Sequence, residues 1–328
     1  MSPWRNLLGR ASRAQGAGNA ATRARHASAP VANGDSGPLL DDDELRQIER
    51  LGLVGLDALT DGLTGEHAGR RRTQEIEFAD YRGYTPGDDF RRIDWNAYAR
   101  LGELFVKTGV AQEALTLSLL LDRSRSMDGG RPNKLRYARR LAAALGAVAL
   151  QRHDAVRLSL LGDGRAQSGE TLRGPAALAT LLTDLDGAPV AAATGLRDSL
   201  DDYRHRDPSR GVVVLLSDLL APLDQVEALG YLAMDGVQAV VLHVVDPSEA
   251  DPPLGGMVEL RDRETGDLVD LTVTPGLRHR YVARFAERAR EVADACARYG
   301  LSYVRVSTST TPTDMALTML RREDVVRS

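Results

Sequence analysis

Strand-sized apolar runs alternate with longer helical segments through most of the chain, and this alternation restricts the fold more than any other feature. Residues 117–121, 212–216 and 237–245 are apolar runs of strand length. The segments at 134–152 and 277–298 are instead typical of helices. Chains that alternate in this way build parallel sheets with right-handed crossovers and helices on both faces. The sequence therefore predicts an α/β fold with a doubly wound, mostly parallel sheet.

Changes in pattern divide the chain into three regions. Residues 114–328 are expected to form the α/β domain, with a β-hairpin inserted at 257–273. Residues 39–113 are expected to hold a helix at 41–63 and then a small β-rich or irregular subdomain. Residues 1–38, rich in Ala, Arg, Gly and Ser, predict a disordered leader. This leader lacks the apolar core of a secretory signal.

One carboxylate and two hydroxyls follow the first central strand. Residues 117–127 read Leu-Ser-Leu-Leu-Leu-Asp-Arg-Ser-Arg-Ser-Met, which spaces Asp122, Ser124 and Ser126 by two. In extended backbone such residues point the same way, and their hard oxygens suit Mg²⁺ or Mn²⁺. A simpler interpretation makes Asp122 a helix cap and the serines ordinary loop residues. For this motif alone the simpler interpretation is favoured.

Two further segments change that balance. Residues 211–218 form another buried-type strand, which ends in Asp218, and Thr194 lies between the two strands. Thr194 has an alternative explanation as a helix N-cap. Asp218 is a poor cap because the next helix is expected to begin near Pro222. Ligand sites of doubly wound sheets lie beyond the carboxyl ends of the strands, where Asp122 and Asp218 both fall.

Together the three segments resemble the metal-ion-dependent adhesion site of von Willebrand factor A domains, in which three loops supply Asp-x-Ser-x-Ser, Thr and Asp. The resemblance implies a metal site, for Mg²⁺ or Mn²⁺, at Asp122, Ser124, Ser126, Thr194 and Asp218. In that family a carboxylate of a partner protein binds the metal, so the resemblance implies metal-bridged recognition of an acidic side chain. Arg123 and Arg125 are expected to point away from the metal, either flanking the partner or solvated.

A second motif lies upstream, from Tyr84 to Trp95. It reads Tyr-Thr-Pro-Gly-Asp-Asp-Phe-Arg-Arg-Ile-Asp-Trp, with a turn expected at its Pro-Gly. Trp95 and Tyr98 are expected to pack inward. The acids of this region, Asp88, Asp89 and Asp94, either pair with nearby arginines or form a second metal site. Ion pairs are favoured because the arginines already supply counter-charges.

The Tyr84–Trp95 motif ahead of a von Willebrand-type metal motif resembles the bacterial family called domain of unknown function 58, over about residues 70–320. The resemblance implies a non-enzymatic adaptor that works beside a MoxR-type AAA+ ATPase in the assembly or activation of client proteins. The chain has no Gly-x-x-x-x-Gly-Lys-Ser/Thr loop, so it is not expected to hydrolyse ATP itself.

Composition restricts the cellular compartment and the classes of partner to be expected. The formal net charge is −4, with an acidic body, which argues against nucleic acid as the main partner. The single cysteine, Cys296, excludes an internal disulfide and is expected to fill the core. No apolar stretch reaches the ~20 residues of a membrane helix. These features favour a cytoplasmic protein without a membrane span.

Two functions of other classes compete with the adaptor. A Mg²⁺-dependent phosphatase or phosphotransferase would use Asp122 as nucleophile, but would want a second Asp two residues on, or a general acid and a Lys close to the site. A nucleotide-binding domain would use Gly162-Asp-Gly164 as a phosphate loop, which is weak without a third glycine. His243, inside an apolar strand, is expected to be a satisfied core histidine rather than a catalytic one.

Overall fold

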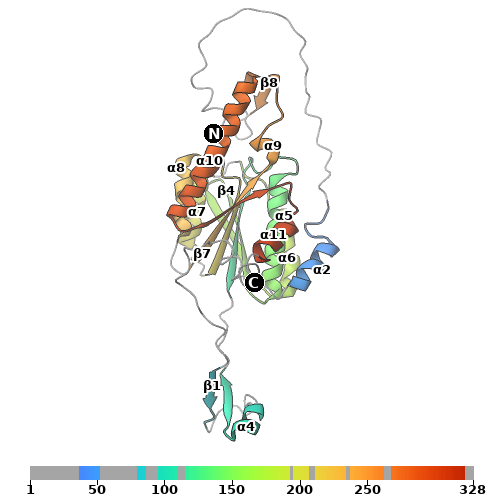
Figure 1. Ribbon diagram of the computed structural model, residues 1–328, viewed down its shortest axis with the longest axis vertical. Coiled ribbons are helices and arrows are strands. Elements are labelled where there is room, and N and C mark those ends of the chain that lie inside the picture. Colours follow the sequence, from blue (N-terminus) through green and yellow to red (C-terminus); the bar gives the residue numbers. More distant parts are fainter. Residues whose placement is uncertain are drawn as a thin grey trace, which may run out of the picture. The chain divides into compact units, whose positions relative to one another are not determined.

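Six strands form the central sheet (Figure 1), in the order β10-β7-β6-β3-β4-β5. All neighbours are parallel except the pair β4 and β5. The apolar runs of the middle strands are buried on both faces, as parallel strands between helices require. The predicted mostly parallel, doubly wound sheet is therefore confirmed. Its strands are β3 (Thr116–Asp122), β4 (Ala155–Gly162), β5 (Arg165–Arg173), β6 (Gly211–Ser217), β7 (Val237–Val245) and β10 (Ser302–Ser307).

This computed structural model describes residues 37–51, 80–85, 95–108, 115–192, 195–206, 211–233, 237–261 and 267–321. The chain divides into two compact units. The smaller unit is Gly65–Ala114, and the larger unit, which contains the central sheet, comprises Met1–Thr64 and Leu115–Ser328.

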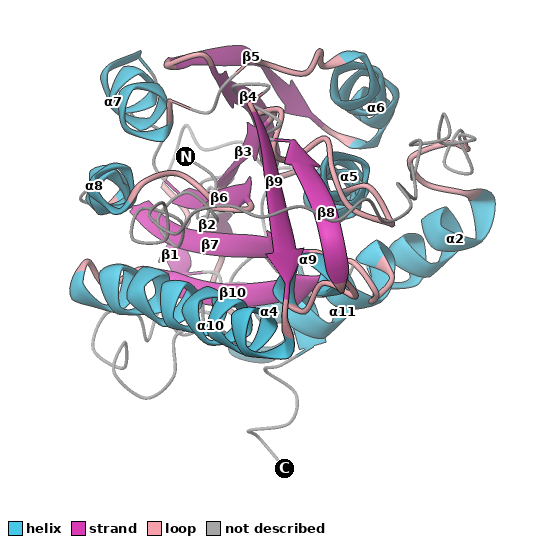
Figure 2. Ribbon diagram, turned by 90° about the horizontal axis from the view of Figure 1, so that it is seen from above, coloured by secondary structure: helices cyan, strands magenta, loops and turns pink. Residues whose placement is uncertain are grey.

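Helices cover both faces of the sheet (Figure 2). One layer packs on residues such as Leu119 and Val214, and it consists of α2 (Asp42–Leu51), α5 (Lys134–Gln151), α6 (Leu178–Gly187, after the 3₁₀ turn Pro175–Ala177) and α11 (Pro312–Arg321). The other packs on residues such as Leu120 and Val241, and it consists of α7 (Leu196–Arg206), α8 (Leu223–Val226), the 3₁₀ helix η4 (Glu227–Leu232) and α10 (Pro275–Arg298). Two apolar cores therefore fix the sheet from both sides.

The N-terminal helix α2 belongs to the larger unit. Asp41 and Glu44 close its first turn reciprocally, because each backbone N–H donates to the other's carboxylate, at 3.0 and 2.8 Å. Ile48 is buried in the core beside α5. The sequence grouping of 39–113 as one region thus differs from the contact-defined units. Residues 52–63 of the expected helix and residues 1–36 of the expected leader lie outside the described residues.

Strand β5 was not expected from the sequence. It pairs antiparallel with β4 through a turn in which Gly162 lies opposite Arg165. Asp163 and Gly164, the two residues between them, have φ of 53° and 71°, the left-handed conformations of a tight hairpin turn. The Gly162-Asp-Gly164 segment considered as a phosphate loop is therefore a hairpin turn. The strand escaped notice because most of its residues are polar and exposed.

The expected inserted hairpin is confirmed as β8 (Gly256–Arg261) and β9 (Leu268–Val273), which pair antiparallel. Met257 and Leu268 are among its exposed apolar residues. A short helix, α9 (Pro247–Ala250), connects β7 to this hairpin. Seen from above in Figure 2, the hairpin lies in front of the end of the sheet.

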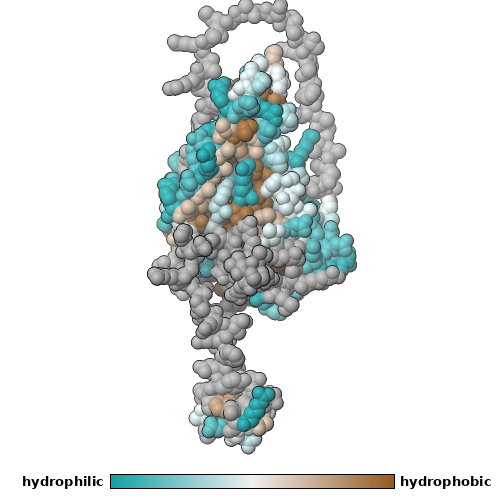
Figure 3. Space-filling model, viewed as in Figure 1, coloured by the Kyte–Doolittle hydropathy of each residue, from teal (hydrophilic) through white to brown (hydrophobic). Residues whose placement is uncertain are grey.

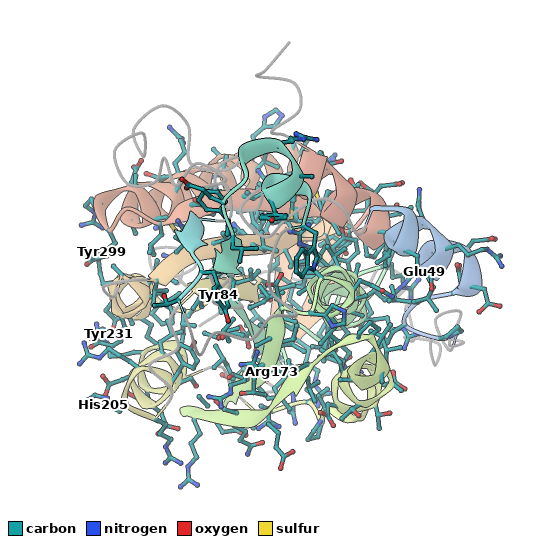
Figure 4. The ribbon with its side chains drawn as sticks, turned by 90° about the horizontal axis from the view of Figure 1, so that it is seen from below. Glu49, Tyr84, Arg173, His205, Tyr231 and Tyr299 are labelled. Carbon is teal, nitrogen blue, oxygen red and sulfur yellow. The ribbon has the colours of Figure 1, made fainter. Side chains whose placement is uncertain are left out.

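Apolar and polar residues are unevenly distributed over the surface of the larger unit. Figure 3 shows hydrophobic residues along the middle of the viewed face and polar residues on either side. Tyr231 and Tyr299 lie on the flank formed by η4 and the end of α10 (Figure 4). The Tyr299 hydroxyl donates to Glu227 at 2.7 Å, and the Arg204 guanidinium lies 4.9 Å from the centre of the Tyr231 ring. These contacts tie η4 to α10 and α7.

The smaller unit pairs β1 (Asp80–Gly83) with β2 (Phe105–Thr108), and α4 (Trp95–Leu101) lies between them in sequence. Trp95 is 60% exposed and Tyr98 46% exposed, so the expectation that both pack inward is wrong. Their rings instead contact each other edge to face, with centroids 6.3 Å apart. The acids Asp88, Asp89 and Asp94 lie outside the described residues.

Among the described residues, no helix has both the length and the apolar character needed to cross a membrane.

Candidate metal centre

Asp122 is the last residue of β3 and is fully buried. The register of β3 against β6 places it beside Ser217, whose hydroxyl donates to Asp122 Oδ2 at 2.6 Å. The backbone N–H of Ser124 donates to Oδ1 at 2.9 Å. Both carboxylate oxygens are therefore held in place, one by the neighbouring strand and one by the loop that follows β3.

The two serines of the loop face each other and Asp218. Ser124 Oγ and Ser126 Oγ lie 3.0 Å apart, and Ser126 Oγ donates to Asp218 Oδ1 at 3.3 Å. A turn closed by the Met127 N–H on the Ser124 carbonyl brings the hydroxyls to the same side. The structure therefore brings together four of the five residues singled out in the sequence. The fifth, Thr194, lies outside the described residues.

Asp218 follows β6 and is only 2% exposed. Its Oδ1 also accepts from the backbone N–H of Leu220 at 3.3 Å, so it orders the loop after β6 and does not cap α8. Its Oδ2 accepts from Lys134 Nζ at 2.8 Å. Each oxygen of Asp218 thus has its own environment: one faces the serine hydroxyls and the other an ammonium.

Lys134 and Glu249 were not identified from the sequence. Lys134, at the start of α5, is fully buried, and its Nζ also donates to Glu249 Oε2 at 2.7 Å. The available signal was that Lys134 is one of only two lysines in a chain with 42 basic residues. Glu249 had no signal, because only the packing of α9 over the loop brings it near.

Burial gives the site its electrostatic character. Burial, together with the charge of Asp218, raises the pKa of Asp122 to about 6. Burial acts to lower the pKa of Lys134, but the charges of Asp218 and Glu249 outweigh it and raise that pKa above its ordinary value. Two buried carboxylates therefore repel each other at one end of the sheet, which favours a cation between them.

The donors fit a hard divalent cation. They are carboxylate and hydroxyl oxygens, which Mg²⁺ and Mn²⁺ prefer over nitrogen or sulfur. Within the described part of the chain, no three His, Cys, Asp or Glu side chains gather as a metal cluster. A metal at this position would therefore depend on the serine hydroxyls as well as on Asp122 and Asp218.

His243 on β7 contacts the loop after β6 that carries Asp218. Its Nδ1 lies 2.7 Å from the Tyr303 hydroxyl, and its ring also hydrogen-bonds the backbone of Asp218. Burial lowers the pKa of His243 to about 4, so the ring is neutral at physiological pH. The expectation of a satisfied core histidine is confirmed. The buried Cys296 likewise fills the core, where burial raises the pKa of its thiol to about 12.

Asp246 connects the first loop to α9. Its Oδ2 accepts from the backbone N–H of Arg131 at 3.0 Å and from the Ser248 hydroxyl at 2.6 Å. Its Oδ1 accepts from the Ser248 N–H at 3.0 Å and so caps α9. The close approach needs the glycine at position 130, since a Cβ there would lie 2.9 Å from Asp246 Oδ2.

Of the two loop arginines, only Arg125 is exposed. Arg123 is buried, and its guanidinium donates to the Pro189 carbonyl at 3.1 Å. Arg123 therefore holds the segment before α7, and it neither flanks a partner nor is solvated, so both expectations are wrong for this residue.

The geometry does not suit Asp122 as a nucleophile. The carboxylate has no exposed surface, and each oxygen already accepts a hydrogen bond. Lys134 lies near the site, as a phosphotransferase would require, but its ammonium is buried between Asp218 and Glu249. These contacts do not suit a covalent mechanism through Asp122.

Comparison with known proteins supplies the family. The family described as "Protein of unknown function DUF58" matches residues 80–291. The chain is 30% identical over 261 residues to "Uncharacterized protein Rv1480" of Mycobacterium tuberculosis (strain ATCC 25618 / H37Rv). The aligned region covers 77% of this chain and 82% of that protein.

Two solved structures show limited similarity. The conserved hypothetical protein BatB from Bacteroides thetaiotaomicron aligns over 65% of this chain and 100% of its own, with 19% identity and a TM-score of 0.39. A von Willebrand factor type A structure from Catenulispora acidiphila aligns over 63% of this chain and 42% of its own, with 15% identity and a TM-score of 0.38. Because the family match spans more than half of the sequence, the chain belongs to the DUF58 family.

Proposed function

We propose that the protein is a non-enzymatic, Mg²⁺-dependent adaptor that binds other proteins through the metal centre at Asp122, Ser124, Ser126 and Asp218. The observation that carries the proposal is the convergence of Ser124, Ser126 and Asp218 within hydrogen-bonding distance, beside the buried Asp122. Thr194 completes the set by resemblance to von Willebrand factor A domains. Mn²⁺ would satisfy the same donors.

The residues divide the work of binding. The serine hydroxyls and Asp218 Oδ1 offer oxygens directly to a cation, whereas Asp122 is held by Ser217 and the Ser124 N–H and supplies negative charge behind them. A bound divalent ion would attract the carboxylate of a partner protein. The protein groups therefore hold and orient the ion and leave its outer side to the partner.

The proposed partners are a MoxR-type AAA+ ATPase and its client proteins, in the cytoplasm. This part of the proposal comes from the family resemblance, in which such proteins act in the assembly or activation of others. It agrees with the sequence in one respect: the chain lacks a phosphate-binding Gly-Lys-Ser/Thr loop, so energy from ATP would come from the partner.

Calorimetric titration of Mg²⁺ and Mn²⁺ tests the metal centre. The variants are Asp122→Asn, which nearly preserves shape, and Ser126→Ala, which removes one hydroxyl. A matched control is Ser309→Ala, since Ser309 Oγ also pairs with a serine hydroxyl, that of Ser307 at 2.7 Å, but at the end of the edge strand β10, three positions from β3 in the sheet. We expect wild type and Ser309→Ala to bind the ion, and both site variants to lose at least about tenfold in affinity.

Capture experiments test the adaptor role. The wild-type protein, immobilised with Mg²⁺, should retain a purified MoxR-type ATPase and release it when chelator is added. Asp122→Asn should retain none. The metal centre would be refuted if the wild type bound neither Mg²⁺ nor Mn²⁺. It would also be refuted if Asp122→Asn and Ser126→Ala bound the ion with wild-type affinity. If the ATPase stays bound when chelator is added, the protein binds its partner without needing the metal.

A further inference from the structure

Lys134 is so completely buried that its ammonium needs negatively charged partners. It is 0% exposed, and its ammonium donates to two carboxylates, Asp218 Oδ2 at 2.8 Å and Glu249 Oε2 at 2.7 Å. Burial of an ammonium is costly unless opposite charges compensate it. The chain otherwise relies almost wholly on arginine, with two lysines among 42 basic residues. A compact ammonium, unlike a planar guanidinium, fits between two closely spaced carboxylates.

The position of this ammonium connects it to the metal centre. Asp218 is shared: its Oδ1 faces Ser126 Oγ at 3.3 Å, and its Oδ2 faces Lys134. Any cation held by the serines and Asp218 Oδ1 would therefore lie on the opposite side of the same carboxylate from Lys134. The two cations would compete for the negative charge of one group.

Glu249 offsets part of this competition. The triad of Lys134, Asp218 and Glu249 contains one positive and two negative charges, which gives a net charge of −1. Asp246, which caps the short helix that carries Glu249, is occupied by the Arg131 and Ser248 donors, and His243 is neutral. The charge next to the metal centre is therefore set mainly by the balance between Lys134 and Glu249.

We propose that Lys134 is a built-in cation that, balanced by Glu249, sets the affinity of the metal centre by fixing how much of the Asp218 charge a metal can use. This inference rests on the proposed function and names Lys134 and Glu249 as positioning residues for it. Both act on the metal through Asp218 and do not bind the metal themselves. By weakening Asp218 as a donor, Lys134 leaves a bound divalent ion more strongly attracted to the carboxylate of a partner.

Four proteins test the proposal: wild type, Lys134→Met, Glu249→Gln and the double variant. The triad charge is −1 in the wild type, −2 without the lysine charge, 0 without the glutamate charge and −1 again in the double variant. Calorimetry with Mn²⁺ alone is the readout. We expect about tenfold tighter binding by Lys134→Met, about tenfold weaker binding by Glu249→Gln, and a double variant within about threefold of wild type.

A purely structural role of Lys134 predicts the opposite for one variant. If the lysine only held Asp218 in place, Lys134→Met would bind Mn²⁺ more weakly, and adding Glu249→Gln would not restore the affinity. That pattern, or equal affinity in all four proteins, would overturn the proposal. Lys107→Met, which removes the other lysine, controls for the loss of a positive charge elsewhere in the chain.

Thermal unfolding in chelator gives a readout that needs no metal. Lys134→Met leaves the buried carboxylate of Asp218 and the partly buried carboxylate of Glu249 without their shared cation. Its Tm should therefore fall below that of wild type, and the double variant should recover part of the loss. If Lys134→Met does not fold, Glu249→Gln still decides, because unchanged Mn²⁺ affinity in that variant refutes the charge balance. Failure of the wild type to bind Mn²⁺ would refute the proposed function itself, and with it the role of Lys134.

Discussion

Two buried ionisable side chains near the metal centre respond to acid in opposite directions. His243 has a folded-state pKa of about 4, below its usual value, so protons bind the unfolded state preferentially and stability falls as the pH drops below about 6.5. Asp122, whose folded-state pKa is raised to about 6, binds a proton preferentially in the folded state and opposes that loss. The pH profile of the wild type therefore reports neither group alone.

The contribution of His243 can be isolated by substitution. We expect the difference in unfolding free energy between wild type and His243→Gln to shrink by about 2 kcal/mol from about pH 7 to about pH 5, because Asp122 contributes equally to both proteins. Urea titrations across this range, in chelator, measure it. His205→Gln removes a histidine exposed on α7 as control. A constant difference between wild type and His243→Gln would show that His243 is not held neutral.

Gly211, at the start of β6, has a backbone conformation that a side chain cannot share. Its φ is +125°, and a Cβ would lie 2.5 Å from the Thr116 carbonyl oxygen of the neighbouring strand. Gly211→Ala should therefore cost about 2 kcal/mol or more in unfolding free energy. Gly187→Ala is the control, since a Cβ there meets nothing within 4 Å, and should change stability by less than about 1 kcal/mol. Equal denaturation midpoints for the two variants would contradict the close approach.

At the scale of elements, α9 and the loop after β3 act together through Asp246. Asp246 is 1% exposed and accepts from donors of both segments. Asp246→Ala should lower the unfolding free energy by about 2 kcal/mol, because it leaves buried donors unpaired and removes the cap of α9. It should also weaken Mn²⁺ binding, because the loop that carries Ser124 and Ser126 loses its anchor.

The control for this prediction lies at the other end of the same short helix, where Asp251 follows the last helical residue. Asp251 pairs with Arg278 at 2.8 Å, but its side chain is 55% exposed, so Asp251→Ala should cost less than about 1 kcal/mol. Stability and Mn²⁺ affinity measured on both variants separate the two positions. If Asp246→Ala binds Mn²⁺ like wild type, α9 does not support the metal loop.

The elements that could be predicted from the sequence are those whose own residues determine them. Apolar runs predict the buried strands β3, β6 and β7. Local sequence patterns predict α10 and the β8–β9 hairpin. Strand β5 gave no such signal, because its polar residues form an exposed edge strand that only pairing with β4 defines.

The same distinction separates the residues of the candidate site. Asp122, Ser124 and Ser126 share one loop, so their spacing predicts their convergence. Lys134 and Glu249 meet only through tertiary packing of α5 and α9, which no local pattern records. Trp95 shows the reverse error: a large aromatic residue predicts burial, yet it is mostly exposed on α4.

At the scale of the whole molecule, the division into two units separates the candidate site from the most diagnostic sequence motif. The residues of both large apolar cores, and Asp122, Ser124, Ser126 and Asp218, all belong to the larger unit. The Tyr84–Trp95 motif belongs to the smaller unit, Gly65–Ala114. The metal centre and the motif therefore belong to parts of the chain with separate internal contacts.

This separation predicts that the larger unit folds and binds metal without the smaller one. A variant in which a flexible Gly/Ser linker replaces residues 65–114 should unfold cooperatively and bind Mn²⁺ within about threefold of the wild-type affinity, because it keeps both cores and every described residue of the site. Far-UV circular dichroism, urea titration and calorimetry measure these properties. Asp122→Asn in the same shortened chain is the control and should lose Mn²⁺ binding. A folded variant that no longer binds Mn²⁺ would mean that the smaller unit contributes to the metal centre, and an unfolded one that its contacts are needed for the sheet.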